Sequence, residues 1–276
     1  MQSFTPRRRQ SGFTIQELLV VIVLVMVLVS FNVPVDAASR RTARRMQNST
    51  QLRGIHQGLV TFANSNKNKF AGFDSRGNII ANSKEMTGNS GDGDTVEARF
   101  WILLDDDFFT PEYAISPSEV AEVDAVEWGG NAGTATVKWN ADTKNYSYAM
   151  LGIKGAAGQA PDNAFAGRGQ EWQQTLNSQA IVLSDRNTGT NATNKVASIH
   201  SDDPGEWTGS VLWNDNHVQF ETTQFFQTKY ANGALHSDRF GDGTDNLFDS
   251  EADPNGRVGV DALMVIAGDD TVHGGE

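Results

Sequence analysis

The stretch GFTIQELLVVIVLVMVLVSFNV, residues 12–33, decides the fold of the first part of this chain. Every residue from Leu18 to Val29 is apolar, and Glu17 is the only charged residue among the 21 positions from Phe13 to Val33. Because about 20 apolar residues cross the hydrocarbon core of a bilayer as a helix, the length fits a single span. Valine favours strands in water, but a segment in lipid must satisfy its own backbone hydrogen bonds, which favours a helix. We therefore predict a transmembrane helix over residues 13–33.

Three arginines, Arg7, Arg8 and Arg9, lie just before this apolar run. Positively charged residues flanking a membrane helix tend to stay on the cytoplasmic side. We therefore expect the N-terminus in the cytoplasm and the body of the chain in the periplasm or outside the cell.

Two ordinary interpretations of the run leave one residue unexplained. A cleaved secretory signal peptide would use Val35-Asp36-Ala37, just before Ala38, as a small-residue cleavage site. A plain signal anchor would account for the arginines and the length. Neither explains Glu17, because a carboxylate at the bilayer centre costs roughly 2.5–3.5 kcal/mol, and acids inside membranes usually have a partner.

A third interpretation supplies that partner. Residues 12–20, GFTIQELLV, resemble the class III signal of type IV prepilins and pseudopilins. The resemblance implies a leader over residues 1–12, cleavage by a prepilin peptidase between Gly12 and Phe13, and methylation of the new Phe13 amine. It also implies that Glu17 pairs with the Phe13 amine of a neighbouring subunit. A subunit that cannot satisfy this acid alone would gain by docking beside another, since opposite charges in lipid each cost less when paired.

Two further positions bear on the resemblance. Pro34 lies where many of these proteins carry a helix-bending proline, whereas Gln16 departs from the family pattern, which usually has an apolar residue there. The family implies a protein in the inner membrane, with one long helix packed on a mainly antiparallel β domain. We therefore expect an α+β, pilin-like fold.

Charge divides the chain into two unlike parts. Residues 1–66 hold eight of the 22 Lys and Arg residues and two of the 34 acids, which leaves 14 bases, 32 acids and a net charge of −18 in residues 67–276. An acidic body repels phosphate, so nucleic-acid binding by it is not expected. The chain has no cysteine, which excludes disulfides and thiolate metal sites.

The apolar pattern predicts that the helix continues over residues 34–66. One face carries an apolar stripe that would pack on the body: Met46, Leu52, Ile55, Leu59 and Phe62. Gly54 and Gly58 weaken this helix modestly but would permit close packing. A cluster of four arginines (Arg40, Arg41, Arg44 and Arg45) would lie just outside the membrane, facing lipid headgroups or the acidic body of the next subunit.

Residues 67–276 are expected to form an extracytoplasmic, β-rich domain, because short β-like runs alternate with Gly, Asn and Asp turns. The candidate strands are 98–104, 135–140, 145–153, 179–185, 209–215, 217–222 and 260–268. The run 98–104 could instead be a short helix. The clearest feature is a hairpin turn at Asn214-Asp215-Asn216, since Asn and Asp tolerate the left-handed backbone that tight turns require.

The body adds to the resemblance. The ordered segments Ser147–Met150 and Ser184–Asn187, then His200 and the 209–220 run, are similar to a large group of prepilin-like proteins. That group has a C-terminal His, about nine residues, then Asp-Gly in a hairpin. Here fourteen residues separate His200 from Asp215, and Asn216 stands in place of the Gly. The group's molecular function is largely uncharacterised, so the similarity implies a fold and an export route.

No catalytic pattern is visible, and we predict that the protein is not an enzyme. The five histidines, His56, His200, His217, His236 and His273, show no metal-ligand spacing, and the Gly-rich stretches lack the Gly-Lys-Ser/Thr of a phosphate loop. His217 is interpreted as a strand-start residue. Ser147, Ser184 and Ser210 lie in strand-like runs instead of a Gly-x-Ser-x-Gly elbow.

Calcium is the one cofactor that the sequence suggests. Closely spaced acids in a Gly-containing loop suit this ion, and the candidate ligands are Asp242, Asp245, Asp249 and Glu251. The alternative is a solvated acidic loop whose Asp side chains cap their own turns.

The functional expectation is a structural subunit of a type IV pilus-like filament or a type II secretion pseudopilus. Its expected partners are a prepilin peptidase, other pilin-like subunits and the inner membrane. The alternative is a membrane-anchored extracytoplasmic binding protein that the same peptidase processes but that never polymerises.

Overall fold

The computed structural model describes residues 12–80, 93, 95–108, 110–119, 146–153, 168–189, 196–201, 205–230, 245–248 and 264–265, without the side chains of 29–38, 168 and 265. The chain divides into two compact units, Met1–Ala43 and Arg44–Glu276. The second unit, called the body below, therefore begins within the predicted helical continuation, before residue 67.

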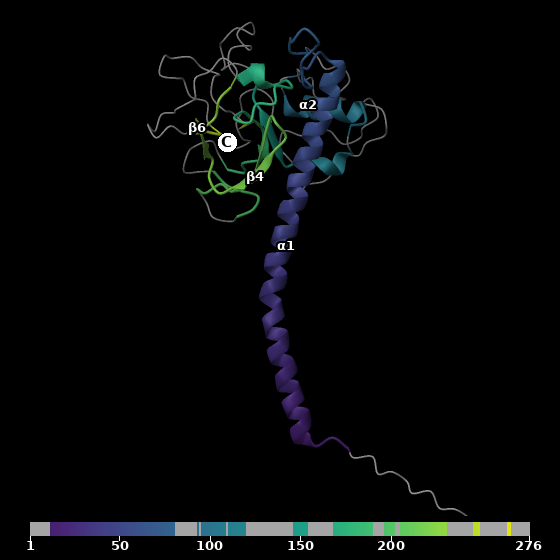
Figure 1. Ribbon diagram of the computed structural model, residues 1–276, viewed down its shortest axis with the longest axis vertical. Coiled ribbons are helices and arrows are strands. Elements are labelled where there is room, and N and C mark those ends of the chain that lie inside the picture. The colour runs from purple at the N-terminus through teal and green to yellow at the C-terminus, as the bar shows by residue number, and fades with distance from the viewer. Residues whose placement is uncertain are drawn as a thin grey trace, which may run out of the picture. The chain divides into compact units, whose positions relative to one another are not determined.

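A single helix, α1, spans Ile15–Ser65, so the predicted helix over residues 34–66 is confirmed (Figure 1). Pro34 lies inside α1. The helix ends where the Asn-rich segment begins: the backbone amides of Asn66 and Asn68 donate to the carbonyl oxygen of Ala63, at 3.0 and 2.9 Å. Lys67 and Asn68 have positive φ angles of 51° and 64°, which reverses the chain direction, as at many helix C-termini. Among the residues described, no helix carries an apolar stretch long enough to cross a membrane.

The run 98–104 is helical, because α2 spans Val96–Asp105. The prediction of a strand there is wrong, and the alternative of a short helix is confirmed. The side chain of Thr95 caps the helix by accepting a hydrogen bond from the Ala98 amide at 3.2 Å. Nearly all of α2 is buried, so the helix has no exposed polar face. Its sequence therefore lacks the alternation of polar and apolar residues, every three to four positions, that identifies a surface helix. Such a continuous apolar run does not distinguish a buried helix from a strand.

The body contains a five-stranded antiparallel sheet with the strand order β4-β3-β2-β1-β7. Its strands are β1 (Tyr148–Leu151), β2 (Ile181–Asp185), β3 (Gly209–Trp213), β4 (Val218–Glu221) and β7 (Met264–Val265). A smaller sheet pairs β5 (Phe225–Phe226) with β6 (Asp245–Asn246). Short 3₁₀ helices, η1 (Pro111–Ala114) and η4 (Arg168–Glu171), lie in the connections. The body is thus α+β with an antiparallel sheet, as predicted.

The predicted hairpin is confirmed. Strands β3 and β4 pair in antiparallel register, and the turn between them closes with the Asn216 amide donating to the Trp213 carbonyl at 2.9 Å. Asn216 has a φ of 69°, the left-handed conformation for which its side chain was expected to be suited. His217 immediately precedes β4, as interpreted from the sequence. The candidate strand at 135–140 lies outside the described residues.

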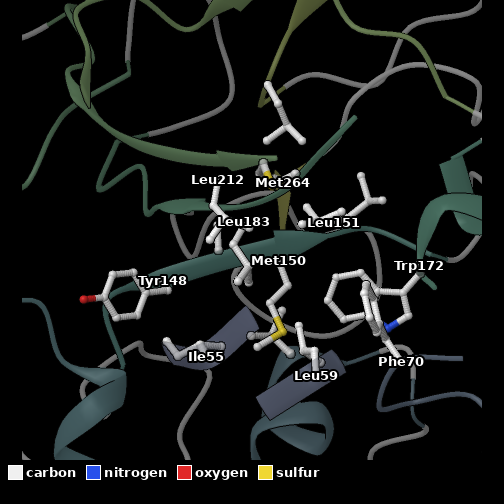
Figure 2. Packing of buried hydrophobic residues seen from close by; sticks show 14 of the residues in the cluster. Ile55, Leu59, Phe70, Tyr148, Met150, Leu151, Trp172, Leu183, Leu212 and Met264 are labelled. Carbon is white, nitrogen blue, oxygen red and sulfur yellow. The ribbon is translucent and has the colours of Figure 1, made fainter. Parts of the chain in front are cut away.

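The core forms where the second half of α1 packs against the sheet. Leu52, Ile55 and Leu59 of α1 are fully buried, and Figure 2 shows Ile55 and Leu59 against Met150 and other sheet residues. The predicted stripe is therefore correct over these three positions, and Phe62 is partly buried at its edge. Met46 does not belong to it, because its side chain is 69% exposed.

Candidate functional site

The predicted cleavage bond between Gly12 and Phe13 is open to solvent. Gly12 is exposed, and a Cβ added to it would have no heavy atom within 4 Å. The side chain of Phe13 is 81% exposed. Among the described residues none covers this bond, so a peptidase could reach it.

Thr14 and Glu17 form a capping box at the start of α1. The Thr14 amide and hydroxyl both donate to Glu17 Oε2, at 2.8 and 2.9 Å, and the Glu17 amide donates to Thr14 Oγ1 at 3.3 Å. This reciprocal arrangement satisfies amides that the first helical turn leaves without partners. The expectation that a lone subunit cannot satisfy Glu17 is therefore wrong for one of its carboxylate oxygens. Pairing of Glu17 with a neighbouring amine stays a prediction.

The first turns of α1 expose a continuous apolar surface. Every large apolar side chain from Phe13 to Leu28 is 46–86% exposed. Soluble monomers rarely expose apolar patches of more than a few hundred Å², and larger ones mark membrane or protein contacts. This surface is one candidate functional site, and Glu17 is the acid at its end.

The four arginines of the cluster are exposed along α1, but Arg45 contacts a strand of the sheet. The guanidinium of Arg45 lies 4.0 Å from the centre of the Phe220 ring, a cation–π contact. Neither sequence-based interpretation of the cluster anticipated this contact. Arg40, Arg41 and Arg44 are exposed and remain candidates for headgroup or subunit contacts.

The second candidate site is a row of side chains across four strands, on the face of the sheet that α1 covers; its polar members, Tyr148, Asp185 and Ser210, are fully buried. Tyr148 of β1 pairs with Asp185 of β2, and Ser210 of β3 pairs with Phe220 of β4. Ser184 pairs with Val211, so the next pair along is Asp185 and Ser210. Residues opposite one another in antiparallel strands share a face of the sheet. Four neighbouring strands therefore place Tyr148, Asp185, Ser210 and Phe220 side by side.

Asn48 of α1 is hydrogen-bonded to the three polar members of this row. Its Nδ2 lies 2.8 and 2.9 Å from the two carboxylate oxygens of Asp185 and 3.0 Å from Ser210 Oγ. Its Oδ1 accepts from the Tyr148 hydroxyl at 2.8 Å, and that hydroxyl can turn to Gln51 Oε1 at 2.9 Å. Burial, and then the charge of Asp185, raises the pKa of Tyr148 well above 10.0, so the hydroxyl stays a donor.

Asp185 is the centre of the row, and it is fully buried. Besides Asn48, it accepts from the Ser210 amide at 2.6 Å and lies 2.7 Å from His200 Nε2. His200 packs edge-on against Phe220, with ring centroids 5.1 Å apart. We call Asn48, Tyr148, Asp185, His200 and Ser210 the Asp185 network.

The Asp185 network contains a Ser, a His and an Asp, but not in the order that nucleophilic catalysis needs. In a triad the His lies between the acid and the nucleophile and takes the nucleophile's proton. Here the carboxylate lies between, and Ser210 Oγ is bonded to Asn48. Asp185, Ser210 and Asn48 are also fully buried, so a substrate could not reach them without opening the helix from the sheet. The geometry suits a structural role, in which buried hydrogen bonds hold α1 against the sheet.

The calcium candidates are mostly outside the described residues. Of the four, only Asp245 is described; it is 1% exposed and its Oδ2 accepts from the Thr228 hydroxyl at 2.7 Å. Asp242, Asp249 and Glu251 lie outside the described residues. No cluster of three or more His, Asp or Glu side chains suited to a metal occurs in the part of the chain that the structure describes. Calcium binding stays a prediction.

The comparisons with known proteins give no match. No family model matches the chain, and neither a curated protein nor a solved structure matches it.

Several members of the Asp185 network lie in the segments that carry the family resemblance, but the sequence does not show that they contact one another. Tyr148, Asp185, His200 and the β3 segment were the residues that carried the resemblance, and the structure brings them together. Asn48 was missed, because a single Asn in a helical segment is ordinary. Its place on the buried face, four residues before Leu52, was the signal that could have found it.

Proposed function

We propose that this protein is a structural subunit of a type IV pilus-like filament or of a type II secretion pseudopilus. In this proposal a prepilin peptidase removes residues 1–12, and residues 13–33 hold the subunit in the inner membrane until assembly. The body lies on the extracytoplasmic side. Subunits then associate through their N-terminal helices.

The observation that carries the proposal is the exposed apolar surface of α1 between Phe13 and Leu28, which ends at a single acid, Glu17. A surface of this kind needs lipid or other helices around it. In a bundle of such helices, the Glu17 carboxylate of one subunit would pair with the Phe13 amine of the next and set their register. Thr14 occupies Oε2 of Glu17, which leaves Oε1 to accept from that amine.

The capping box favours the alternative function. Because the Thr14 amide and hydroxyl both donate to Glu17, a purely local role in starting α1 would be enough to account for this acid. A membrane-anchored binding protein that never polymerises would need nothing more from it. The two functions therefore differ in whether the charge of Glu17 is required, or only its hydrogen-bonding capacity.

Two substitutions separate these functions. Glu17→Gln keeps an acceptor for Thr14 but removes the charge, and Thr14→Val removes the cap but keeps the charge. If the protein is a filament subunit, Glu17→Gln should abolish filaments seen by electron microscopy, and Thr14→Val should reduce them far less. If Glu17→Gln forms filaments like the unchanged protein, the charge of Glu17 does not set their register. If the unchanged protein forms no filaments and Glu17→Gln localises as it does, the filament proposal is wrong.

The same preparations test processing. The intact mass and N-terminal sequence of the membrane-bound protein should show a chain that starts at methylated Phe13. An uncut Met1 would leave a plain anchor, and a start at Ala38 would indicate a secreted protein.

A further inference from the structure

Strand β4 forms one edge of the five-stranded sheet, and among the described strands it pairs with β3 alone. The pairing runs without a bulge from Gly209 and Glu221 at one end to Leu212 and Val218 at the other. Natural proteins usually protect an edge strand with a proline, a lysine or a bulge, because its unpaired main-chain groups can bind another chain. None of these three devices occurs between Val218 and Glu221.

The main-chain groups that β4 directs away from β3 are those of Val218 and Phe220. The Trp213 amide donates to the His217 carbonyl at 3.1 Å, so these two residues form a hydrogen-bonded pair. Such pairs alternate along an antiparallel ladder, so Gln219 is bonded to β3 and its two neighbours in β4 point outward. Among the described residues, no hydrogen bond reaches the main chain of Val218 or Phe220. Their N–H and C=O groups are therefore available to a further strand.

A cation lies over this open edge. Side chains alternate along a strand, so Val218 and Phe220 share the face of the sheet that α1 covers. The Arg45 guanidinium lies 4.0 Å from the centre of the Phe220 ring. Arg45 is exposed and makes no ion pair with any residue that the structure describes. The single carboxylate of β4 belongs to Glu221, which alternation places on the opposite face.

These groups define the chemistry of a strand that would fit the edge. A residue opposite Phe220 would have its Cα about 5.5 Å away and its side chain on the same face, beside Arg45. A glutamate at that position could pair with the guanidinium, which has no carboxylate partner of its own among the described residues. The residue opposite Val218 would share that face and meet an apolar neighbour.

We propose that the edge of β4 is a binding site for an extended acidic segment of another protein, which adds an antiparallel strand to the sheet and pairs its carboxylate with Arg45. A second copy of this chain would not satisfy the site with its own β4, because that strand carries no acid on the face of Phe220. The site lies wholly within the body, so it does not depend on the filament proposal.

The test uses the full chain in detergent micelles and a heptapeptide of alternating threonine and valine with glutamate at its centre, blocked at both ends. Hydrogen exchange detected by NMR reports on each amide separately. The amides of Val218 and Phe220 should exchange more slowly when this Glu peptide is added, by about tenfold at a peptide concentration ten times Kd. The amides of Gln219 and Glu221 already belong to the ladder with β3, so they should change far less and serve as an internal control.

A second peptide, with glutamine in place of the glutamate, tests the charge. It should bind the unchanged protein about two- to fivefold more weakly than the Glu peptide, which is the range for an exposed ion pair. Arg45→Gln should remove the difference between the peptides. The matched control is Arg53→Gln, at another exposed arginine of α1, which should preserve the difference.

The main-chain contact can be tested without a protein variant. Methylation of the glutamate amide nitrogen in the peptide should abolish binding, because that N–H would donate to β4. The proposal is wrong if the Glu peptide leaves the exchange of Val218 and Phe220 unchanged, or if the methylated peptide binds equally well. It is also wrong if the Glu and Gln peptides bind with the same Kd, or if their difference survives in Arg45→Gln. Protection of Val218 and Phe220 that rises with protein concentration alone would assign the edge to a second copy instead.

Discussion

Removing one amide side chain from α1 should weaken the attachment of the helix to the sheet. Asn48→Ala deletes the group that bridges the Asp185 carboxylate and the Tyr148 hydroxyl, at 2.8 Å in each direction. Asn48 is fully buried, and so are both partners.

The size of the loss follows from what each partner keeps. Hydrogen bonds to charged groups contribute about 1.5–3 kcal/mol, and Asp185 loses one of its donors while it keeps His200 and the Ser210 amide. Tyr148 can turn to Gln51 Oε1 at 2.9 Å, so its share of the loss is small. We expect Asn48→Ala to lower the free energy of unfolding by about 2–3 kcal/mol.

A second substitution at this position gives a sharper result. Asn48→Asp would place another carboxylate against Asp185, and two adjacent carboxylates cannot both be charged at little cost. Its destabilisation should exceed that of Asn48→Ala at neutral pH and should shrink on acidification, as one of the two carboxylates takes up a proton.

The assay is urea unfolding of the full chain in detergent, followed by far-UV circular dichroism at pH 7.5 and pH 5. Thr50→Ala, an exposed site two residues away, serves as the control and should stay within about 0.5 kcal/mol of the unchanged protein. A loss below about 1 kcal/mol for Asn48→Ala would refute the argument that the Asp185 network holds α1 in place.

Three further predictions concern the body. Leu59→Ala should lower the free energy of unfolding in urea by about 2–5 kcal/mol, because Leu59 is fully buried. Met46→Ala, at a side chain that is 69% exposed, should change it by less than about 0.5 kcal/mol. Equal effects of the two substitutions would contradict the placement of the core. Gly209→Ala should lower the free energy of unfolding by about 1–3 kcal/mol, because the new Cβ would lie 2.5 Å from Cζ2 of the buried Trp207. Gly54→Ala should lower it less, because the Tyr113 ring that the new Cβ would meet is 37% exposed and can move. The reverse order of the two variants in thermal unfolding would contradict this reasoning. Calcium should raise the thermal midpoint of the full chain and a chelator should reverse the rise, and a midpoint that calcium leaves unchanged would count against ligation by Asp242, Asp245, Asp249 and Glu251.

Several features could be predicted because they depend on neighbours along the chain. The hairpin at Asn214–Asn216 needs residues that accept a left-handed backbone, and Asn216 adopts it. The end of α1 follows from the Asn-rich segment after residue 63 in the same way. The apolar run between Phe13 and Val33, with its single acid, is likewise a property of the sequence alone.

Other features were decided by the tertiary structure. The run at 98–104 is a helix that Thr95 caps and that is buried on nearly all sides, and the apolar pattern alone could not distinguish it from a buried strand. Met46 lies outside the core, with a side chain that is 69% exposed, although Asn48, two residues later on the same helix, is fully buried. Asn48, Tyr148, Asp185, His200 and Ser210 are separated by up to 162 positions in the chain, and only strand register and helix packing bring them within hydrogen-bonding distance. Periodicity along a sequence reports which face of an element is apolar, but the partners of a buried polar group depend on which elements become neighbours in space.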